Sequence, residues 1–398
     1  EGVWRLTAMA GNPVLFTPQA AIDAANQMVV TFRMRLGKGI ASNGCLLFVT
    51  DTQTQWDDKT IVSFPCRSDG EFHTYDVDMS KNPLWKGRVR QLRFQPMYLG
   101  WPMPEEHRVV EIDYFRVPDL AAGAATVPVD KTPFHVLTRE VVTDHIAWAE
   151  PWAGGAVKVL ATPVCRDVVE LAQRLSIDFT TWRKFEEGDN GAGNAVMNDL
   201  YYGRQERTLI ASYQELASKV AGDPDVILMG QQWWGKTFSW EGLPARLKKA
   251  ILEKVRGGAG LIYVRPSPEA RTELAGEAEQ EMPLPGNVLV GVPYAGLAVL
   301  DRDVEGTDWL KCFALGKGRI ALVDYQNEFF GAFEAERSFR RGATCPFTPD
   351  VTYDARSKPF EYEYHQSLLA KLVLWAGGKE GPVTFRKLAV EKGRLTAD

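Results

Sequence analysis

The chain has 398 residues, of which 45% are hydrophobic and 24% are charged, and its formal net charge is −5. This length exceeds one ordinary hydrophobic core and fits two domains, and the composition is that of a globular protein rather than a disordered one. The mildly acidic balance excludes a strongly basic nucleic-acid-binding surface, and no apolar run reaches the ~18 residues of a membrane span. We therefore expect neither a nucleic-acid nor a membrane partner.

The first part of the chain, residues 1–118, has the pattern of short strands separated by turns. Apolar and polar residues alternate within the strand segments, and turn signals such as Asn43-Gly44 and Asp69-Gly70 separate them. Many short strands at this spacing predict an antiparallel β-sandwich. The predicted strands are 28–36, 45–50, 72–77, 89–94 and 109–117.

Three stretches within this part resemble a known family: DGEFHTYDVDMS from Asp69, NPLWKGRVRQLRFQP from Asn82, and VVEIDYFRV from Val109. They resemble the jelly-roll modules attached to secreted polysaccharide-degrading enzymes. The resemblance covers about half of the first domain, and it implies a jelly-roll fold more specifically than any ligand. It also implies an extracellular or periplasmic location, and we expect no signal peptide within the residues given.

Several residues of this domain are candidates for particular roles. Trp85 is expected to pack the turn at Lys86-Gly87, and Asp113 either binds a structural cation or hydrogen-bonds within the sheet. Trp56, in a polar run, and Trp101, in a loop with Gly and Pro, are predicted to bind carbohydrate, because a pyranose ring stacks on an indole face. The alternative for the tryptophans is packing in a core or interface.

The chain between the two parts, residues 119–133, is small, aperiodic and rich in Ala and Pro, so we predict a linker there. The five cysteines are scattered and form no CxxC pair, which argues against a zinc site, and we expect no metal or cofactor. A single Cys45–Cys66 disulfide and buried free thiols both remain open.

In residues 134–390 the pattern changes to alternating strands and helices, which predicts a parallel sheet with flanking helices. Pro244 lies near the start of one helix, apolar residues recur at helical spacing, and Gly257-Gly258 ends it. The predicted strands are 157–163, 177–181, 225–229, 260–264, 288–292 and 319–323, and the predicted helices are 167–175, 208–220, 244–256 and 363–376.

The stretches VRGGAGLIYV, GKGRIALVDY and HQSLLAKLVLW in this part resemble the class I glutamine-amidotransferase-like family. The resemblance implies a flavodoxin-like α/β domain over most of the second half. It is closest to the non-catalytic, trimerising domain of certain β-galactosidases, and it therefore implies a homo-oligomer. Amidotransferase chemistry needs a Cys on the turn after a central strand. Arg265-Pro266-Ser267-Pro268 occupies that turn, so we interpret this chemistry as lost.

Aromatic and amide residues are predicted to follow the strands of the α/β domain, where ligands of such sheets bind. Trp182, Gln232, Trp233 and Trp234 are therefore candidate carbohydrate-binding residues, with interface packing of Trp233 and Trp234 as the alternative. Glycoside hydrolysis requires two carboxylates, and Asp178 and Glu328 are the catalytic candidates.

These observations leave three hypotheses. The first is a carbohydrate-associated protein, or the accessory region of a polysaccharide-degrading enzyme, that binds a polysaccharide or oligosaccharide and oligomerises. The second is a glycoside hydrolase with its active site at the strand ends of the α/β domain. The third is a structural subunit of an extracellular assembly, for which a large apolar patch around Trp233-Trp234 would be evidence.

Overall fold

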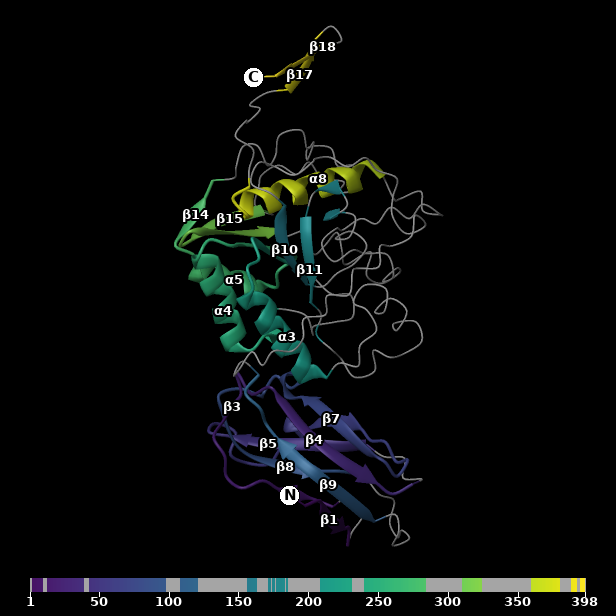
Figure 1. Ribbon diagram of the computed structural model, residues 1–398. Coiled ribbons are helices and arrows are strands. Elements are labelled where there is room, and N and C mark those ends of the chain that lie inside the picture. The colour runs from purple at the N-terminus through teal and green to yellow at the C-terminus, as the bar shows by residue number, and fades with distance from the viewer. Residues whose placement is uncertain are drawn as a thin grey trace.

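The structure is a computed structural model that describes only part of the chain, and every structural statement below concerns that part. Two antiparallel sheets built from the N-terminal residues lie at one end, and a larger sheet with helices lies next to them (Figure 1). The described residues are 2–9, 13–38, 43–97, 108–120, 156–162, 171–172, 174–175, 177–182, 184, 208–230, 240–283, 310–323, 359–379, 388–391 and 394–397.

The N-terminal strands form a four-stranded sheet of order β1-β9-β4-β7 and a second sheet of order β2-β8-β5-β6, in which β3 also pairs with β8. All of these pairings are antiparallel. The five longest predicted strands are confirmed, with ends that differ by one or two residues. The strands are β1 (Trp4–Thr7), β2 (Leu15–Phe16), β3 (Ile22–Asp23), β4 (Val29–Leu36), β5 (Asn43–Thr50), β6 (Val62–Pro65), β7 (Phe72–Asp78), β8 (Arg88–Gln95) and β9 (Val109–Arg116).

The two sheets face each other across one hydrophobic core. Phe32 of β4 lies at its centre, with its ring centroid 5.1 Å from that of Phe64 on β6 and 4.8 Å from that of Phe94 on β8. Trp85 is buried and packs edge-on against Phe48 at 4.9 Å, so it is a residue of this core. Alternate residues of each strand fill this core, as the period of two requires.

The second part contains a seven-stranded sheet of order β11-β10-β12-β13-β16-β15-β14. The first five strands are parallel, but β15 pairs antiparallel with both β16 and β14, so the predicted parallel sheet is a mixed one. The cause is a tight hairpin in which Gly316, with φ of +59°, lets the chain reverse between β15 and β16. The strands are β10 (Val157–Thr162), β11 (Ile177–Thr181), β12 (Val226–Met229), β13 (Gly260–Val264), β14 (Gln280–Met282), β15 (Leu310–Leu315) and β16 (Gly318–Val323).

Helices cover both faces of this sheet. The helices α3 (Leu209–Ala221), α4 (Ala245–Arg256) and α5 (Pro268–Glu277) pack on one face, and α8 (Pro359–Ala376) packs on the other. The helices predicted at 208–220, 244–256 and 363–376 are confirmed, whereas α5 was not predicted. The predicted strand 288–292 lies outside the described residues, as does most of the predicted helix 167–175. A short C-terminal hairpin joins β17 (Leu388–Glu391) to β18 (Arg394–Ala397).

The N-terminal sheets contact the helix-bearing part through a buried ion pair, a backbone hydrogen bond and a shared hydrophobic cluster. Lys184 Nζ lies 2.7 Å from Asp78 Oδ2 at the end of β7, and both side chains are buried. The Ala245 N–H donates to Ala25 O at 2.9 Å, so the first turn of α4 is capped by the N-terminal part. The hydrophobic cluster under α3 and α4 also includes Val29 and Leu120. Leu120, at the start of the predicted linker, is therefore part of this contact.

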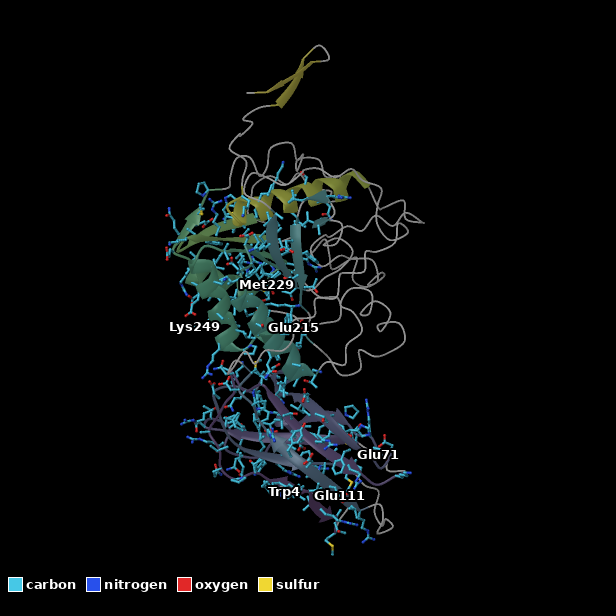
Figure 2. The ribbon with its side chains drawn as sticks, viewed as in Figure 1. Trp4, Glu71, Glu111, Glu215, Met229 and Lys249 are labelled. Carbon is cyan, nitrogen blue, oxygen red and sulfur yellow. The ribbon has the colours of Figure 1, made fainter. Side chains whose placement is uncertain are left out.

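Figure 2 shows Trp4 on the N-terminal sheets and Met229 and Glu215 in the helix-bearing part. Met229 ends β12 and is buried in the cluster beneath α3 and α4, and Glu215 pairs with Lys219 one turn along α3 at 2.6 Å. None of the helices in the described segments is long and apolar enough to cross a membrane.

Candidate functional site

An aromatic pair lies on the surface of the N-terminal sheets. Phe16, on the edge strand β2, is 55% exposed, and Trp56, in the loop after β5, is half-buried. Their ring centroids are 5.4 Å apart and the planes meet at 60°. Large rings are normally buried, so two that contact each other edge to face at a surface form an exposed apolar pair against which a ligand can pack. We call Phe16 and Trp56 the aromatic platform.

The loop that carries Trp56 is held by local hydrogen bonds. The hydroxyl of Thr50 accepts the N–H of Gln53 at 2.9 Å, and the carboxylate of Asp57 accepts the N–H of Lys59 at 2.8 Å, capping a short 3₁₀ helix. Asn82 Nδ2 then donates to Lys59 O at 2.8 Å. These contacts fix the backbone on both sides of Trp56, so little ordering entropy remains to be lost when a ligand binds.

Polar side chains lie beside the platform on the outer face of the same sheet. Leu92 and Phe94 of β8 point into the core, so Arg93 and Gln95, which alternate with them, lie on the opposite face. The strand register places Arg93 directly opposite Phe16 on β2. We call Arg93 and Gln95 the donor pair, and it shares one face with the aromatic platform.

One side-chain nitrogen of each member of the donor pair lacks a hydrogen-bond partner among the described residues. Gln95 is only 3% exposed, and its Nε2 is buried without a hydrogen bond; the buried Nε of Arg93 also lacks one in the described structure. Arg90, on the same strand, differs because it pairs with Asp51. Buried donors without an acceptor are costly, which makes the donor pair a notable feature of this face.

Two cysteines lie near the donor pair, and they do not form a disulfide. Cys45 is buried opposite Gln95, and Cys66 donates its S–H to Pro96 O at 3.2 Å. Burial raises the pKa of the Cys45 thiol, Arg93 opposes this shift and Asp58 adds to it. Free thiols, one of the two alternatives left open by the sequence, are therefore what the structure contains.

The carboxyl end of the central strand β13 leads into a tight turn before α5. Arg265 has a φ of +58°, in the left-handed region that side chains rarely adopt. Ser267 then caps α5 by accepting the N–H of Ala270 at 3.0 Å, and its hydroxyl donates to Glu241 Oε1. The same Glu241 oxygen accepts the Ala270 N–H at 3.0 Å. Both polar groups thus serve the helix N-terminus, where carboxylates and hydroxyls are stabilising.

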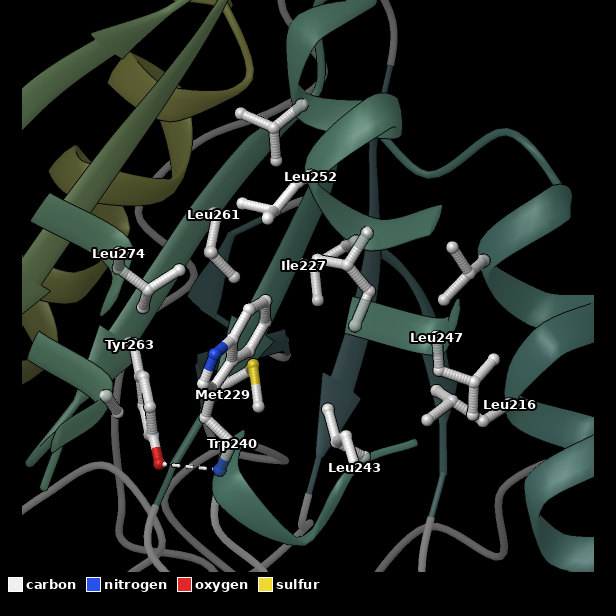
Figure 3. Packing of buried hydrophobic residues seen from close by; sticks show 14 of the residues in the cluster. Leu216, Ile227, Met229, Trp240, Leu243, Leu247, Leu252, Leu261, Tyr263 and Leu274 are labelled. Atoms are coloured by element: carbon white, nitrogen blue, oxygen red, sulfur yellow. Dashed lines mark hydrogen bonds between the residues drawn. The ribbon is translucent and has the colours of Figure 1, made fainter. Parts of the chain in front are cut away.

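The same end of the sheet holds a buried phenol. Tyr263 Oη accepts the Trp240 N–H at 3.3 Å, and both side chains pack among Leu261, Met229 and Leu274 (Figure 3). Burial raises the pKa of Tyr263 to about 12, so this phenol stays neutral and serves as a packing group.

The structure corrects the prediction for Trp182 and shows where Asp178 lies. Trp182 is 1% exposed, donates its indole N–H to Ser212 O at 2.5 Å and packs beside Tyr213, so it is a core residue rather than a sugar platform. Asp178 is exposed but lies near the amino end of β11, at the edge opposite the one where ligands of such sheets bind. Trp101, Gln232, Trp233, Trp234 and Glu328 lie outside the described residues.

Asp113 forms an ion pair with Arg33 at 2.7 Å. Of the two roles considered for Asp113, a structural cation site and a hydrogen bond within the sheet, this contact is the second. In the described segments, no group of three potential metal ligands gathers at one place. Phe16, Arg93 and Gln95 were missed by the sequence analysis. The alternation within Arg88–Gln95 could have placed Arg93 and Gln95 opposite the core, but the contact of Phe16 with Trp56 joins segments that are distant in the chain.

Comparisons with known proteins found no matching family model and no matching curated protein. Among solved structures, an isomalto-dextranase of Arthrobacter globiformis T6 complexed with panose aligns over 28% of this chain and 17% of its own, with 12% identity and a TM-score of 0.17. A xylanase 10C mutant from Cellvibrio japonicus in complex with xylopentaose aligns over 64% of this chain and 47% of its own, with 8% identity and a TM-score of 0.18. A structure of the Gt strain of infectious bursal disease virus aligns over 28% of this chain and 32% of its own, with 8% identity and a TM-score of 0.16. The chain thus spans less than half of each of these structures, and such TM-scores do not establish a shared fold.

Proposed function

We propose that this chain is a carbohydrate-associated protein, or the accessory region of a polysaccharide-degrading enzyme, that binds glycan through its N-terminal sheets. The aromatic platform of Phe16 and Trp56 carries this proposal. A pyranose ring has apolar C–H faces that stack on aromatic rings, and the braced loop presents Trp56 in a fixed position. The resemblance of residues 69–117 to jelly-roll modules supports the same reading, as does the face-to-face packing of the two antiparallel sheets.

The helix-bearing part is proposed to be a flavodoxin-like scaffold without amidotransferase chemistry. Numbered along the chain, its five parallel strands have the order 2-1-3-4-5, which is the flavodoxin-like order. The turn after β13 carries Arg265 where an amidotransferase has its nucleophile, and Ser267 is engaged in capping α5. By its resemblance to a trimerising domain, this part would assemble the chain into a homo-oligomer, in an extracellular or periplasmic location.

Affinity electrophoresis through a panel of soluble polysaccharides tests the binding proposal. Retardation by one or more glycans is expected, and each of Phe16→Ala and Trp56→Ala should weaken binding about tenfold, since each ring contributes about 1.5 kcal/mol of stacking. Trp4→Ala is the matched control, because Trp4 is 65% exposed but lies on the other sheet. Unchanged retardation in both platform variants, or a loss in Trp4→Ala alone, would contradict the proposed site.

The same panel separates the alternatives. Release of reducing sugar from a retarded glycan would favour a glycoside hydrolase, and the loss of that release in Glu328→Gln would assign the site to the helix-bearing part. A stable oligomer in analytical ultracentrifugation without retardation by any glycan would favour a structural subunit.

A further inference from the structure

The outer face of the sheet β2-β8-β5-β6 combines the aromatic platform with the donor pair. Arg93 and Phe16 are directly opposed across two strands, a pairing in which Cα atoms lie about 5 Å apart. Gln95 follows two residues along β8 on the same face, about 7 Å further. A single sugar unit stacked on the platform therefore lies within reach of the guanidinium.

The nitrogens of the donor pair lack acceptors although one of the two side chains is almost completely buried. Gln95 is 97% buried with an unpartnered Nε2, and Arg93 is half-buried with an unpartnered Nε. Folding normally leaves such donors satisfied, because each one costs free energy when it has lost water and gained nothing. The donors thus call for an acceptor that the chain does not provide in its described part.

The charges around the donor pair favour an anionic acceptor. Asp51 is neutralised by Arg90, and the carboxylate of Asp57 caps the 3₁₀ helix, so neither is paired with Arg93. Asp58 is an exposed acid close enough to raise the pKa of the Cys45 thiol, whereas Arg93 lowers it. Elsewhere on these sheets Arg33 and Arg35 pair with acids, whereas Arg93 makes no ion pair in the described structure.

We infer that this face binds an acidic glycan, with the carboxylate of a uronic acid unit held by Arg93 and Gln95 while its ring stacks on one ring of the aromatic platform and contacts the edge of the other. The inference rests on the proposed function, since the platform supplies the sugar contact. A planar carboxylate matches the fork of a guanidinium, which gives two parallel charge-assisted hydrogen bonds. The Nε2 of Gln95 is buried in the unbound chain, so its side chain must turn outward on binding before the amide can donate to the same carboxylate or to a neighbouring hydroxyl.

The test is affinity electrophoresis of the full chain with polygalacturonate, alginate, glucuronoxylan and hyaluronate, each beside its carboxyl-reduced form. At least one uronate polymer should retard the chain at least tenfold more strongly than its reduced form. Arg93→Met keeps the aliphatic stem and should abolish that preference. Arg90→Met is the matched control, because it removes the same charge from the same strand but from an arginine that already has a partner. Asp58→Asn should strengthen binding, because it removes the exposed acid.

The outcomes distinguish this inference from the proposed function. Binding of neutral glycans that depends on Trp56, with no preference for uronates, would overturn the acidic specificity and leave the proposed function standing. A uronate preference that Arg93→Met abolishes but Phe16→Ala and Trp56→Ala leave unchanged would support the carboxylate site and contradict the platform. Stronger retardation by a sulfated galactan than by every uronate polymer, or no retardation by any acidic polymer, would overturn the inference.

Discussion

Replacing Lys184 with methionine should destabilise the protein by about 3 kcal/mol, because it removes one partner from a buried ion pair. Lys184 is 3% exposed and its ammonium lies 2.7 Å from Asp78 Oδ2 and 5.7 Å from the ring centre of Tyr213. Removing one member of such a pair costs about 3–5 kcal/mol. The lower end applies here, since Asp78 keeps its bonds to the N–H and hydroxyl of Ser80 at 3.1 and 2.5 Å.

The direction of the pKa shift of Lys184 follows from its environment. Burial alone lowers the pKa of its ammonium, but Tyr213 and Asp78 raise it more, so the net shift is upward. A raised pKa means that the pair contributes its full stability at every pH below the ordinary lysine value and loses it only in strong alkali. The difference between the wild type and Lys184→Met should therefore stay constant between pH 6 and about pH 9.

Urea denaturation followed by tryptophan fluorescence measures this effect. Asp78→Asn should also destabilise the protein, and the double variant should lose less than the sum of the two single changes, because neither charge is then left alone. Lys249→Met is the matched control, since Lys249 is exposed on α4 and 3.7 Å from Glu253, a surface pair worth well under about 1 kcal/mol. A Lys184→Met variant within about 0.5 kcal/mol of the wild type would refute the reasoning that this contact joins the two parts.

Two further predictions concern packing and alkaline stability. A Cβ at Gly318 would lie 2.0 Å from Val255 O, so Gly318→Ala should lower the free energy of unfolding in urea by at least ~2 kcal/mol. Gly276 lies on an open face of α5, so Gly276→Ala should raise that free energy by about 0.5–1 kcal/mol. Equal effects of the two substitutions would contradict the packing. Burial raises the pKa values of Tyr263 and Cys312 to about 12, above their ordinary values of 10.0 and 9.0, so unfolding releases protons and stability should fall as the pH rises from 9 towards 12. An ultraviolet titration in which Tyr263→Phe leaves the alkaline phenolate curve unchanged up to about pH 11 checks this, and loss of a normal titration step near pH 10 in that variant would contradict it.

The elements predicted well are those whose sequence pattern repeats often enough to be read. The strand 28–36 alternates over four pairs of residues and appears as β4, and α4 has its apolar spacing, a proline at its start and glycines at its end. The strands β2 and β3 have two residues each, too few for any alternation. Their pairing with β8 is a tertiary contact, and the hairpin that adds β15 was missed because Gly316 was not recognised as its turn.

The candidate site was predicted only in part. Trp56 was predicted from its polar surroundings, because an aromatic residue whose sequence neighbours are hydrophilic is not part of a buried segment. The same reasoning failed for Trp182, whose neighbours in the sequence do not reveal that α3 covers its ring. The alternation within β8 is a local signal for the donor pair, but its place beside Phe16 depends on strand register, which brings segments about 75 residues apart onto one face.

The measurement that tests the central claim most directly is the retardation of the Phe16→Ala/Trp56→Ala double variant, beside the wild type and Trp4→Ala, in gels containing the glycan that retards the wild type most. We predict that the double variant migrates as it does in a gel without glycan, while Trp4→Ala is retarded like the wild type and all three unfold at similar urea concentrations. Retardation of the double variant equal to that of the wild type would contradict a carbohydrate-binding site on this face.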